Sequence, residues 1–251
     1  MVAIGFEFND MLPEVATAHP DTKFLLIDSC PFDKMKPNIY CSVFREYEAS
    51  FLTGVEAALT SKTGKVGAIG ALDIQFLHRY TDGFTLGAKH VKPDVGVAPT
   101  LWVGGNNPFS DPARGQQRAA AMVADNVDRV LAAGAGSNGG IFKAMEDLEG
   151  ATAFGVDVNQ CPQAPGTIVD NAIKRIDKVV LDLVTQIQNV DKGGTSTDYG
   201  LAQDGSTVTS LTEDAATSGC VVLQHPEVLD QVRAARDRII KGEITIPHAD
   251  N

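Results

Sequence analysis

A glycine-rich segment offers the clearest chemistry in this sequence. Residues 134–139 are Gly-Ala-Gly-Ser-Asn-Gly, which satisfies the GxGxxG pattern, with Gly136 and Ser137 at its centre. Asp157 follows 18 residues after Gly139. Glycines let a backbone approach a ligand closely, and a helix that begins there presents N–H donors to ligand oxygens. The segment therefore predicts a loop that binds a dinucleotide, a loop that binds another small molecule, or a purely structural turn.

Three charged residues are candidates for polar contacts with a ligand. Asp157 follows a buried apolar run in FGVDVNQ, where a carboxylate can accept two hydrogen bonds from a vicinal diol such as a ribose. Lys174 is predicted on a long helix, from which its ammonium reaches a ligand oxygen or Asp157. Asp10 is the third candidate. The simpler alternatives are a helix cap for Asp157, a solvated lysine at position 174 and an ordinary helix-terminal residue at position 10.

Two aromatic residues flank the end of a predicted strand. Trp102 and Phe109 can each stack on a planar base there or fill the core. No constellation typical of an enzyme accompanies them, because the sequence contains no HExxH, no GxSxG and no complete phosphate-binding loop. The residues by themselves therefore give no support for an enzyme, and we expect no cofactor and no metal ion.

Composition limits the class of protein and its partners. Of 251 residues, 43% are hydrophobic and 21% charged, which is enough apolar surface for a sizeable core and unlike a disordered chain. The net charge of −11 disfavours nucleic acids and anionic membrane surfaces as partners. No apolar run is long enough to span a membrane, and the first residues predict no signal peptide.

The four cysteines form no CxxC pair, so a zinc site or a thioredoxin-like site has little support. Buried thiols are the first expectation. A disulfide between Cys30 and Cys41, which flank a short loop, is the alternative if the protein is exported.

Short apolar runs alternate with amphipathic helical patterns along the chain. Strands are predicted at 2–6, 23–27, 39–44, 65–70, 95–103, 128–133, 153–156 and 206–211. The clearest helical patterns span 46–61, 140–148, 169–187 and 226–241. Such alternation is typical of an α/β protein with parallel sheets covered by helices, in which ligands bind at the carboxyl ends of the strands.

Eight stretches follow one another in a characteristic order and cover nearly the whole chain: IGFEFNDMLPEVATAHPDTKFLLID, FREYEASFLTGVEAALTSKTGKVGAIGALD, FLHRYTDGFTLGAKHVKPD, FSDPARGQQRAAAMV, AAGAGSNGG, FGVDVNQ, NAIKRID and IIKGEITIP. Together they resemble the BMP family (basic membrane proteins, or purine-nucleoside-receptor-like proteins), the substrate-binding lipoproteins of ABC transporters. The resemblance implies a type I periplasmic-binding-protein fold with two Rossmann-like lobes, crossover hinges and a ligand cleft between the lobes. Lobe 1 is expected at 1–63 with about 166–200, and lobe 2 at 64–165 with about 201–251.

The resemblance also implies a function. Members of the family capture a purine nucleoside or a similar heterocycle and deliver it to an ABC permease, as lipid-anchored proteins in the periplasm or outside the cell. By the match of motifs, Asp10 corresponds to an aspartate that contacts the base, and Asp157 and Lys174 correspond to residues that hold the ribose. Gly136 and Ser137 correspond to the loop beside the ligand.

Two features depart from the family pattern. The family's N-terminal portion, with its export signal, its lipid-anchored cysteine and part of the base site, has no counterpart here, so lobe 1 is expected to be incomplete. Leu131 stands in the strand before the glycine-rich loop, where many relatives carry an aromatic residue that stacks on the base. The alternative function from another class is an NAD(P)-dependent oxidoreductase that uses residues 134–139 and Asp157.

Overall fold

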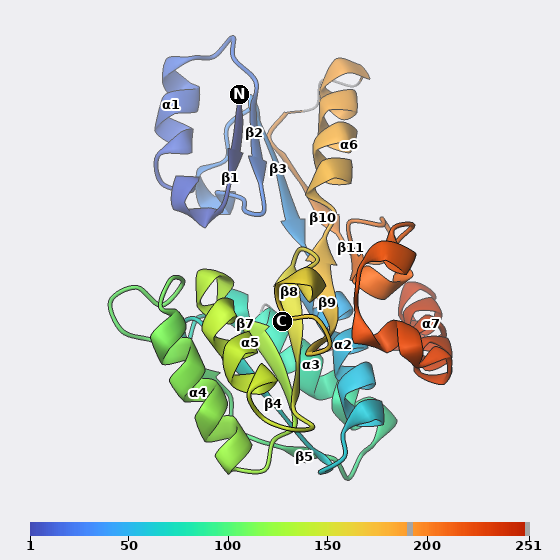
Figure 1. Ribbon diagram of the computed structural model, residues 1–251. Coiled ribbons are helices and arrows are strands. Elements are labelled where there is room, and N and C mark those ends of the chain that lie inside the picture. The colour runs from blue at the N-terminus through green and yellow to red at the C-terminus, as the bar shows by residue number, and fades with distance from the viewer. Residues whose placement is uncertain (190–192, 249–251) are drawn as a thin grey trace. The chain divides into compact units, whose positions relative to one another are not determined.

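The computed structural model describes residues 1–189 and 193–248 and falls into two compact units (Figure 1). Unit 1 comprises Met1–Arg45 and Lys174–Ser206, and unit 2 comprises Glu46–Ile173 and Thr207–Asn251. Each unit is an α/β structure in which the paired neighbours among β1 to β10 run parallel, as the alternation of strands and helices predicts.

Unit 1 contains a four-stranded sheet in the order β1-β2-β3-β10. Its strands are β1 (Val2–Ile4), β2 (Phe24–Ile27), β3 (Ile39–Phe44) and β10 (Thr195–Tyr199). Helix α1 (Leu12–Ala18) packs with Phe24 and Leu26, while helix α6 (Ile176–Asn189) packs with Leu25 and Ile27. Because successive side chains of a strand point to opposite faces, the two helices cover opposite faces of this sheet.

Strand β1 forms one edge of this sheet and carries exposed apolar side chains. Val2 and Ile4 are paired in register with Leu25 and Ile27, so they lie on the face that α6 covers, and each is 50% exposed. Leu181 of α6 is exposed as well. The expectation that lobe 1 is incomplete stays a prediction.

Unit 2 is built on a seven-stranded sheet in the order β11-β9-β8-β7-β4-β5, with β6 also paired to β4. Its strands are β4 (Lys65–Gly70), β5 (Gly96–Val97), β6 (Leu101–Trp102), β7 (Arg129–Ala133), β8 (Thr152–Asp157), β9 (Ile168–Lys174) and β11 (Ser206–Val208). Its helices are α2 (Glu46–Thr60), α3 (Gln75–Val91), α4 (Pro112–Ala124), α5 (Asn138–Glu146) and α7 (Pro226–Ile240). The terminal residues Lys174 and Ser206 of β9 and β11 belong to unit 1.

Helix α2 belongs to unit 2, in which it packs against α3. A Cβ added at Gly54 of α2 would lie 1.9 Å from the carbonyl oxygen of Phe84, and one added at Gly87 of α3 would lie 1.9 Å from that of Phe51. The two glycines therefore let the helix backbones touch.

The helix predicted over 169–187 is wrong in its first part, because residues Ile168–Lys174 form strand β9 and helix α6 begins at Ile176. All residues of β9 are buried, so the strand lacks the alternation of apolar and polar residues that marks a half-exposed strand. Its apolar residues then continue in step with the helical spacing of α6. Lys174 is thus the last residue of a strand.

Two smaller differences have clear local causes. The strand predicted over 95–103 is divided into β5 and β6, with Pro99, which has no N–H to donate, between them. Strand β10 was not predicted, because its residues Thr195–Tyr199 are mainly polar and partly exposed. Helix α4 begins at Pro112, with Asp111 as its N-cap accepting a hydrogen bond from the Arg114 N–H at 3.0 Å.

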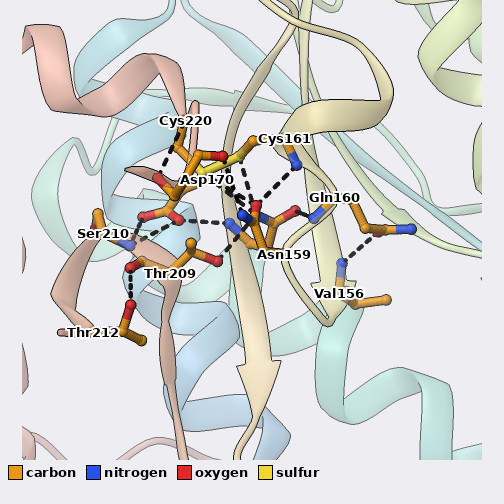
Figure 2. Close-up of a disulfide and its surroundings, with 11 residues drawn as sticks. Val156, Asn159, Gln160, Cys161, Asp170, Thr209, Ser210, Thr212 and Cys220 are labelled. Atoms are coloured by element: carbon orange, nitrogen blue, oxygen red, sulfur yellow. Dashed lines mark hydrogen bonds between the residues drawn. A yellow bond between two sulfur atoms is a disulfide. The ribbon is translucent and has the colours of Figure 1, made fainter. Parts of the chain in front are cut away.

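Both cysteine pairs are disulfides. Cys30 is joined to Cys41, and Cys161 to Cys220. The prediction of buried thiols is therefore wrong, and the alternative of a Cys30–Cys41 bridge is confirmed. Figure 2 shows the second bridge, which joins the segment after β8 to the segment before α7 within unit 2.

Two carboxyl groups are fully buried in unit 2. Glu56 of α2 and Asp170 of β9 are both 0% exposed. Asp170 accepts hydrogen bonds from the backbone N–H groups of Asn171 and Ser210. Burial raises the pKa of Asp170 to about 6 in spite of these hydrogen bonds. Burial, reinforced by the neighbouring Asp170, also raises the pKa of Glu56 well above its usual range.

The two disulfides are expected to differ in their contribution to stability. Replacing Cys161 and Cys220 by serine should lower the free energy of unfolding by about 4 kcal/mol, and the same change at Cys30 and Cys41 by about 3 kcal/mol. The cause is loop length, because the bridged cysteines are separated by 59 and 11 residues respectively. Urea denaturation without reductant measures both values, and a larger loss from the short loop would contradict the expectation.

Asp170 should make the protein less stable as the pH rises. Its carboxyl titrates at about 6 in the folded chain, above the ordinary value of 3.8, so its favourable contribution is complete below pH 4 and is lost through pH 6. Asp170→Asn should remove up to roughly 3 kcal/mol of this pH dependence, at 1.36 kcal/mol per pKa unit. Urea denaturation of both proteins between pH 4 and 8 tests this, and identical pH profiles would refute it.

Candidate functional site

Asp157 ends strand β8 at the carboxyl edge of the sheet in unit 2. Its backbone adopts the left-handed conformation, with φ of 69°, and its carboxylate accepts a hydrogen bond from the Tyr80 hydroxyl at 2.5 Å. Asp157 is partly exposed, whereas Tyr80 is only 2% exposed. The next turn, Cys161–Gln163, has Gln160 rather than Asp157 at its N-cap, so the helix-cap alternative for Asp157 is wrong. A carboxylate at this position is of the type that accepts the hydrogen bonds that a diol donates.

Buried amides fix the turn that carries Asp157. The Gln160 side-chain oxygen accepts hydrogen bonds from the Val156 N–H at 3.1 Å and from the Asn138 amide at 3.2 Å. The Asn138 side chain also binds the backbone of residues 132 and 134, on either side of the end of β7. One pair of side chains thus connects the loops that follow β7 and β8.

A second amide cluster holds the same turn from the other side (Figure 2). The Asn171 amide donates to the Asn159 side-chain oxygen at 3.3 Å and to the Thr209 hydroxyl at 3.1 Å, and its oxygen accepts from the Gln160 N–H at 3.2 Å. It lies beside the Cys161–Cys220 disulfide, at 3.2 Å from the Cys161 sulfur. Residues 157–161 are therefore anchored to β9 and to the segment around residue 220.

The glycine-rich loop lies where the sequence predicts, between β7 and α5. Ser137 is completely buried, and its hydroxyl donates to the Pro108 carbonyl and accepts from the Asp111 N–H, both at 2.8 Å. A Cβ added at Gly136 would lie 3.0 Å from the Phe109 carbonyl oxygen. These contacts bring Gly136, Ser137 and Phe109 together and attach the loop to residues 108–111.

Two glycines near the glycine-rich loop are explained by helix packing. A Cβ at Gly140 of α5 would lie 1.7 Å from the Pro112 carbonyl oxygen, and one at Gly115 of α4 would lie 2.5 Å from the Ser137 carbonyl oxygen. The N-terminal ends of α4 and α5 are therefore in backbone contact. This packing accounts for Gly115 and Gly140, which lie outside the GxGxxG pattern.

Trp102, at the end of β6, lies with its ring over Gly70. A Cβ at Gly70 would be 2.2 Å from a Trp102 ring atom, so only glycine admits the ring there. The His78 ring lies 5.2 Å from the Trp102 ring, and its hydrogen bond to Asp73 raises the pKa of His78. Trp102 and Phe109 are both half-buried. Trp102 is the last residue of β6, and Phe109 lies in the loop that follows this strand.

In unit 1, Lys174 pairs with a carboxylate that the sequence analysis did not single out. Its ammonium lies 2.8 Å from Asp28 Oδ2 and 5.4 Å from the centre of the Phe44 ring. The Lys174 side chain is only 4% exposed, so the alternative of a solvated lysine is wrong. Asp28 directly follows β2, at the carboxyl end of a buried apolar run.

Asp10 is placed differently from the other candidates. Its side chain is 94% exposed and forms an ion pair with Lys34 at 2.8 Å. The hydrogen bond and charge of Lys34 lower the pKa of Asp10. At this position Asp10 is a surface carboxylate with a surface partner.

Tyr80 and Asp28 are the residues that sequence reasoning missed. Asp28 carried the same signal as Asp157, an aspartate directly after a buried strand, and was passed over. Tyr80 carried no usable signal, because its aromatic ring fits the apolar face of helix α3 and its hydroxyl acquires a role only through a residue 77 positions away.

A cavity of about 500 Å³ in unit 1 lies apart from the predicted site residues. Its lining includes Lys23, Lys36, Asn38 and Tyr40. Lys23 precedes β2 and Asn38 precedes β3, so these residues mark the amino ends of the strands. Because ligands of such sheets bind at the carboxyl ends, this cavity does not support a ligand site by its position.

Among the described residues, no helix is both long and apolar enough to cross a membrane, and no group of three or more His, Cys, Asp or Glu residues is arranged to hold a metal ion.

Comparison with known protein families and sequences gives a consistent result. A family model described as ABC transporter substrate-binding protein PnrA-like matches residues 1–250. The ABC transporter nucleoside-binding protein BmpA of Lactococcus lactis subsp. cremoris is 30% identical over 98% of this chain and 70% of its own length. The CD4+ T-cell-stimulating antigen of Listeria monocytogenes is 29% identical over 97% of this chain and 69% of its own.

Solved structures agree with the sequence comparisons. An ABC transporter solute-binding protein from Aeropyrum pernix K1 superposes with a TM-score of 0.79 and 24% identity, over 98% of this chain and 77% of that one. A transcriptional activator of the comK gene from Bacillus halodurans gives a TM-score of 0.79 at 21% identity, over 98% of this chain and 80% of that one. The type I periplasmic-binding-protein fold is therefore confirmed.

The Lys174–Asp28 pair should contribute more to stability than a surface pair on the same unit. Lys174→Met keeps the apolar stem but removes the charge opposite a mostly buried carboxylate, which should lower the free energy of unfolding by about 3 kcal/mol. Lys178→Met, which removes the exposed pair with Asp182, is the matched control and should cost less than about 1 kcal/mol. Urea denaturation measures both, and equal losses would contradict this assignment.

Proposed function

Because this chain belongs to the family of PnrA-like ABC transporter substrate-binding proteins, we propose that it binds a purine nucleoside or a similar heterocycle and delivers it to an ABC permease. The nucleoside-binding relative from Lactococcus lactis supports this class of ligand. The protein's role in this proposal is capture of the ligand, without chemical conversion.

The observation that carries the proposal is the geometry of Asp157. Its carboxylate stands at the carboxyl end of β8, partly exposed, on a turn that buried amides hold in place. Two oxygens of one carboxylate match the spacing of two adjacent hydroxyl groups, as on a ribose. In unit 1, Lys174 is the proposed second ribose contact, with its ammonium oriented by Asp28.

Of the remaining candidates, Trp102, Phe109 and Asp10 are proposed to contact the base. The rings of Trp102 and Phe109 offer faces on which a planar heterocycle can stack. Because its hydroxyl is committed to Pro108 and Asp111, Ser137 is proposed to act with Gly136 by shaping the loop. Asp10 is proposed to contact the base after exchanging its surface partner Lys34 for the ligand. The predicted lobe boundaries and the cleft between lobes stay predictions.

We propose a periplasmic or extracellular location. The two disulfides support it, because disulfides persist in oxidising compartments and are rare in a reducing cytosol. The family of ABC transporter substrate-binding proteins supports the same location.

A panel of ligands tests the proposed function. Adenosine, guanosine, inosine, pyrimidine nucleosides, riboflavin, pentoses and NAD(P) are added separately to the protein, and the melting temperature is measured. A nucleoside at 100 times its Kd should stabilise the fold by about 2.7 kcal/mol. Stabilisation by NAD(P) without any effect of nucleosides would favour the oxidoreductase alternative, and no stabilisation by any compound would contradict the proposal.

Asp157→Ala should weaken binding of the preferred nucleoside by about 10- to 100-fold, because a hydrogen bond to a charged group contributes about 1.5–3 kcal/mol. Asp230→Ala, which removes an exposed carboxylate of α7 paired with Arg233, is the control and should leave the affinity unchanged. Isothermal titration calorimetry measures the affinities. Equal affinities of the Asp157→Ala variant and the unmodified protein would remove Asp157 from the site.

A further inference from the structure

We propose that Tyr80 is a positioning residue that orients the carboxylate of Asp157 and thereby makes the protein prefer ligands with a vicinal diol. This inference rests on the proposed function, because it assigns the ligand's sugar to Asp157. It adds a residue from helix α3, which neither the sequence motifs nor the comparisons connect with ligand binding.

The first argument is the hydrogen bond itself. The Tyr80 hydroxyl donates to Asp157 Oδ1 at 2.5 Å, at the short end of the range for a hydroxyl bound to a carboxylate. Charge-assisted hydrogen bonds of this kind are about twice as strong as neutral ones. The bond fixes the position of one carboxylate oxygen and therefore the direction of the carboxylate plane.

The second argument is the backbone at Asp157. Its φ of 69° lies in the left-handed region, which an aspartate adopts at some cost. The Val158 N–H donates to the Val156 carbonyl at 2.8 Å, and Gln160 binds the Val156 N–H, so the turn is closed on both sides of Asp157. The turn fixes the backbone position of Asp157, and the hydrogen bond from Tyr80 fixes the position of one carboxylate oxygen.

The third argument is the rigidity of Tyr80. Its side chain is 2% exposed, and its ring lies edge-on to the Phe76 ring, 5.9 Å between centres. Helix α3 is in turn held against α2 by the backbone contact at Gly87. A donor on a buried ring of a packed helix loses little freedom when it binds, so the carboxylate is oriented before a ligand arrives.

The consequence is selectivity for the sugar. An aspartate that is already oriented can bind two adjacent hydroxyl groups without first losing rotational freedom, whereas a freely rotating aspartate pays that entropy on each binding event. The base makes no use of this carboxylate in the proposed site. Loss of the Tyr80 hydroxyl should therefore weaken the binding of the ligand's sugar and leave the binding of the base unchanged.

Tyr80→Phe removes a single oxygen atom and tests the proposal. Calorimetry gives the Kd of the preferred nucleoside and of its 2′,3′-dideoxy analogue, which lacks the diol, for this variant and for the unmodified protein. The nucleoside should bind about 10-fold more weakly to the variant, while the dideoxy analogue should change less than about 2-fold. Tyr47→Phe, which removes another tyrosine hydroxyl from unit 2, is the control and should change neither affinity.

A double-mutant cycle separates positioning from general damage to the fold. In the Asp157→Ala background, Tyr80→Phe should have no further effect on nucleoside affinity, because its only route to the ligand has been removed. Equal weakening of nucleoside and dideoxy analogue, additive effects in the cycle, or unchanged nucleoside affinity would each overturn the role of Tyr80. Absence of nucleoside binding to the unmodified protein would instead overturn the proposed function.

Discussion

The carboxyl edge of the sheet in unit 2 depends on three buried amide side chains, Asn138, Gln160 and Asn171. Where β7 and β8 end, their backbone groups lose the neighbouring strand as a hydrogen-bond partner, and an unpaired buried polar group is costly. These amides supply the missing donors and acceptors, and Gly155 leaves room for them, since a Cβ there would lie 2.2 Å from Asn171 Oδ1. The loops that carry the candidate residues are therefore fixed by the core.

Each unit presents an aspartate in the same local setting. Asp28 follows β2 with φ of 66°, and Asp157 ends β8 with φ of 69°. In both cases a buried donor holds the carboxylate: the ammonium of Lys174 in unit 1 and the hydroxyl of Tyr80 in unit 2. A left-handed residue at the end of a parallel strand turns its side chain out of the sheet, and the buried donor then sets its direction. The proposed recognition of a sugar uses this arrangement.

Glycine has a different meaning in this protein from the one its motif suggests. The GxGxxG pattern is typical of a loop that approaches a pyrophosphate. Here its central Gly136 approaches the Phe109 carbonyl, and Gly140, which directly follows the pattern, approaches that of Pro112. The same property, the absence of a Cβ, serves contact between two helices. A pattern of glycines predicts close approach of something to the backbone, and only the packing identifies what approaches.

The sequence alone determined the α/β class, most strands and helices, the family resemblance and the position of Asp157 at a strand end, because these follow from local periodicity and from motifs contiguous in the chain. Tertiary structure decided the rest. Strand β9 is buried on both faces and therefore lacks the alternation of apolar and polar residues that marks a half-exposed strand. Its apolar residues fit the spacing of a helix instead. Lys174 and its partner Asp28 are 146 residues apart in the sequence, and Asp157 and Tyr80 are 77 apart. The cysteines of the second disulfide are 59 residues apart. Such pairings arise only when packed elements bring distant residues together, which no local pattern records.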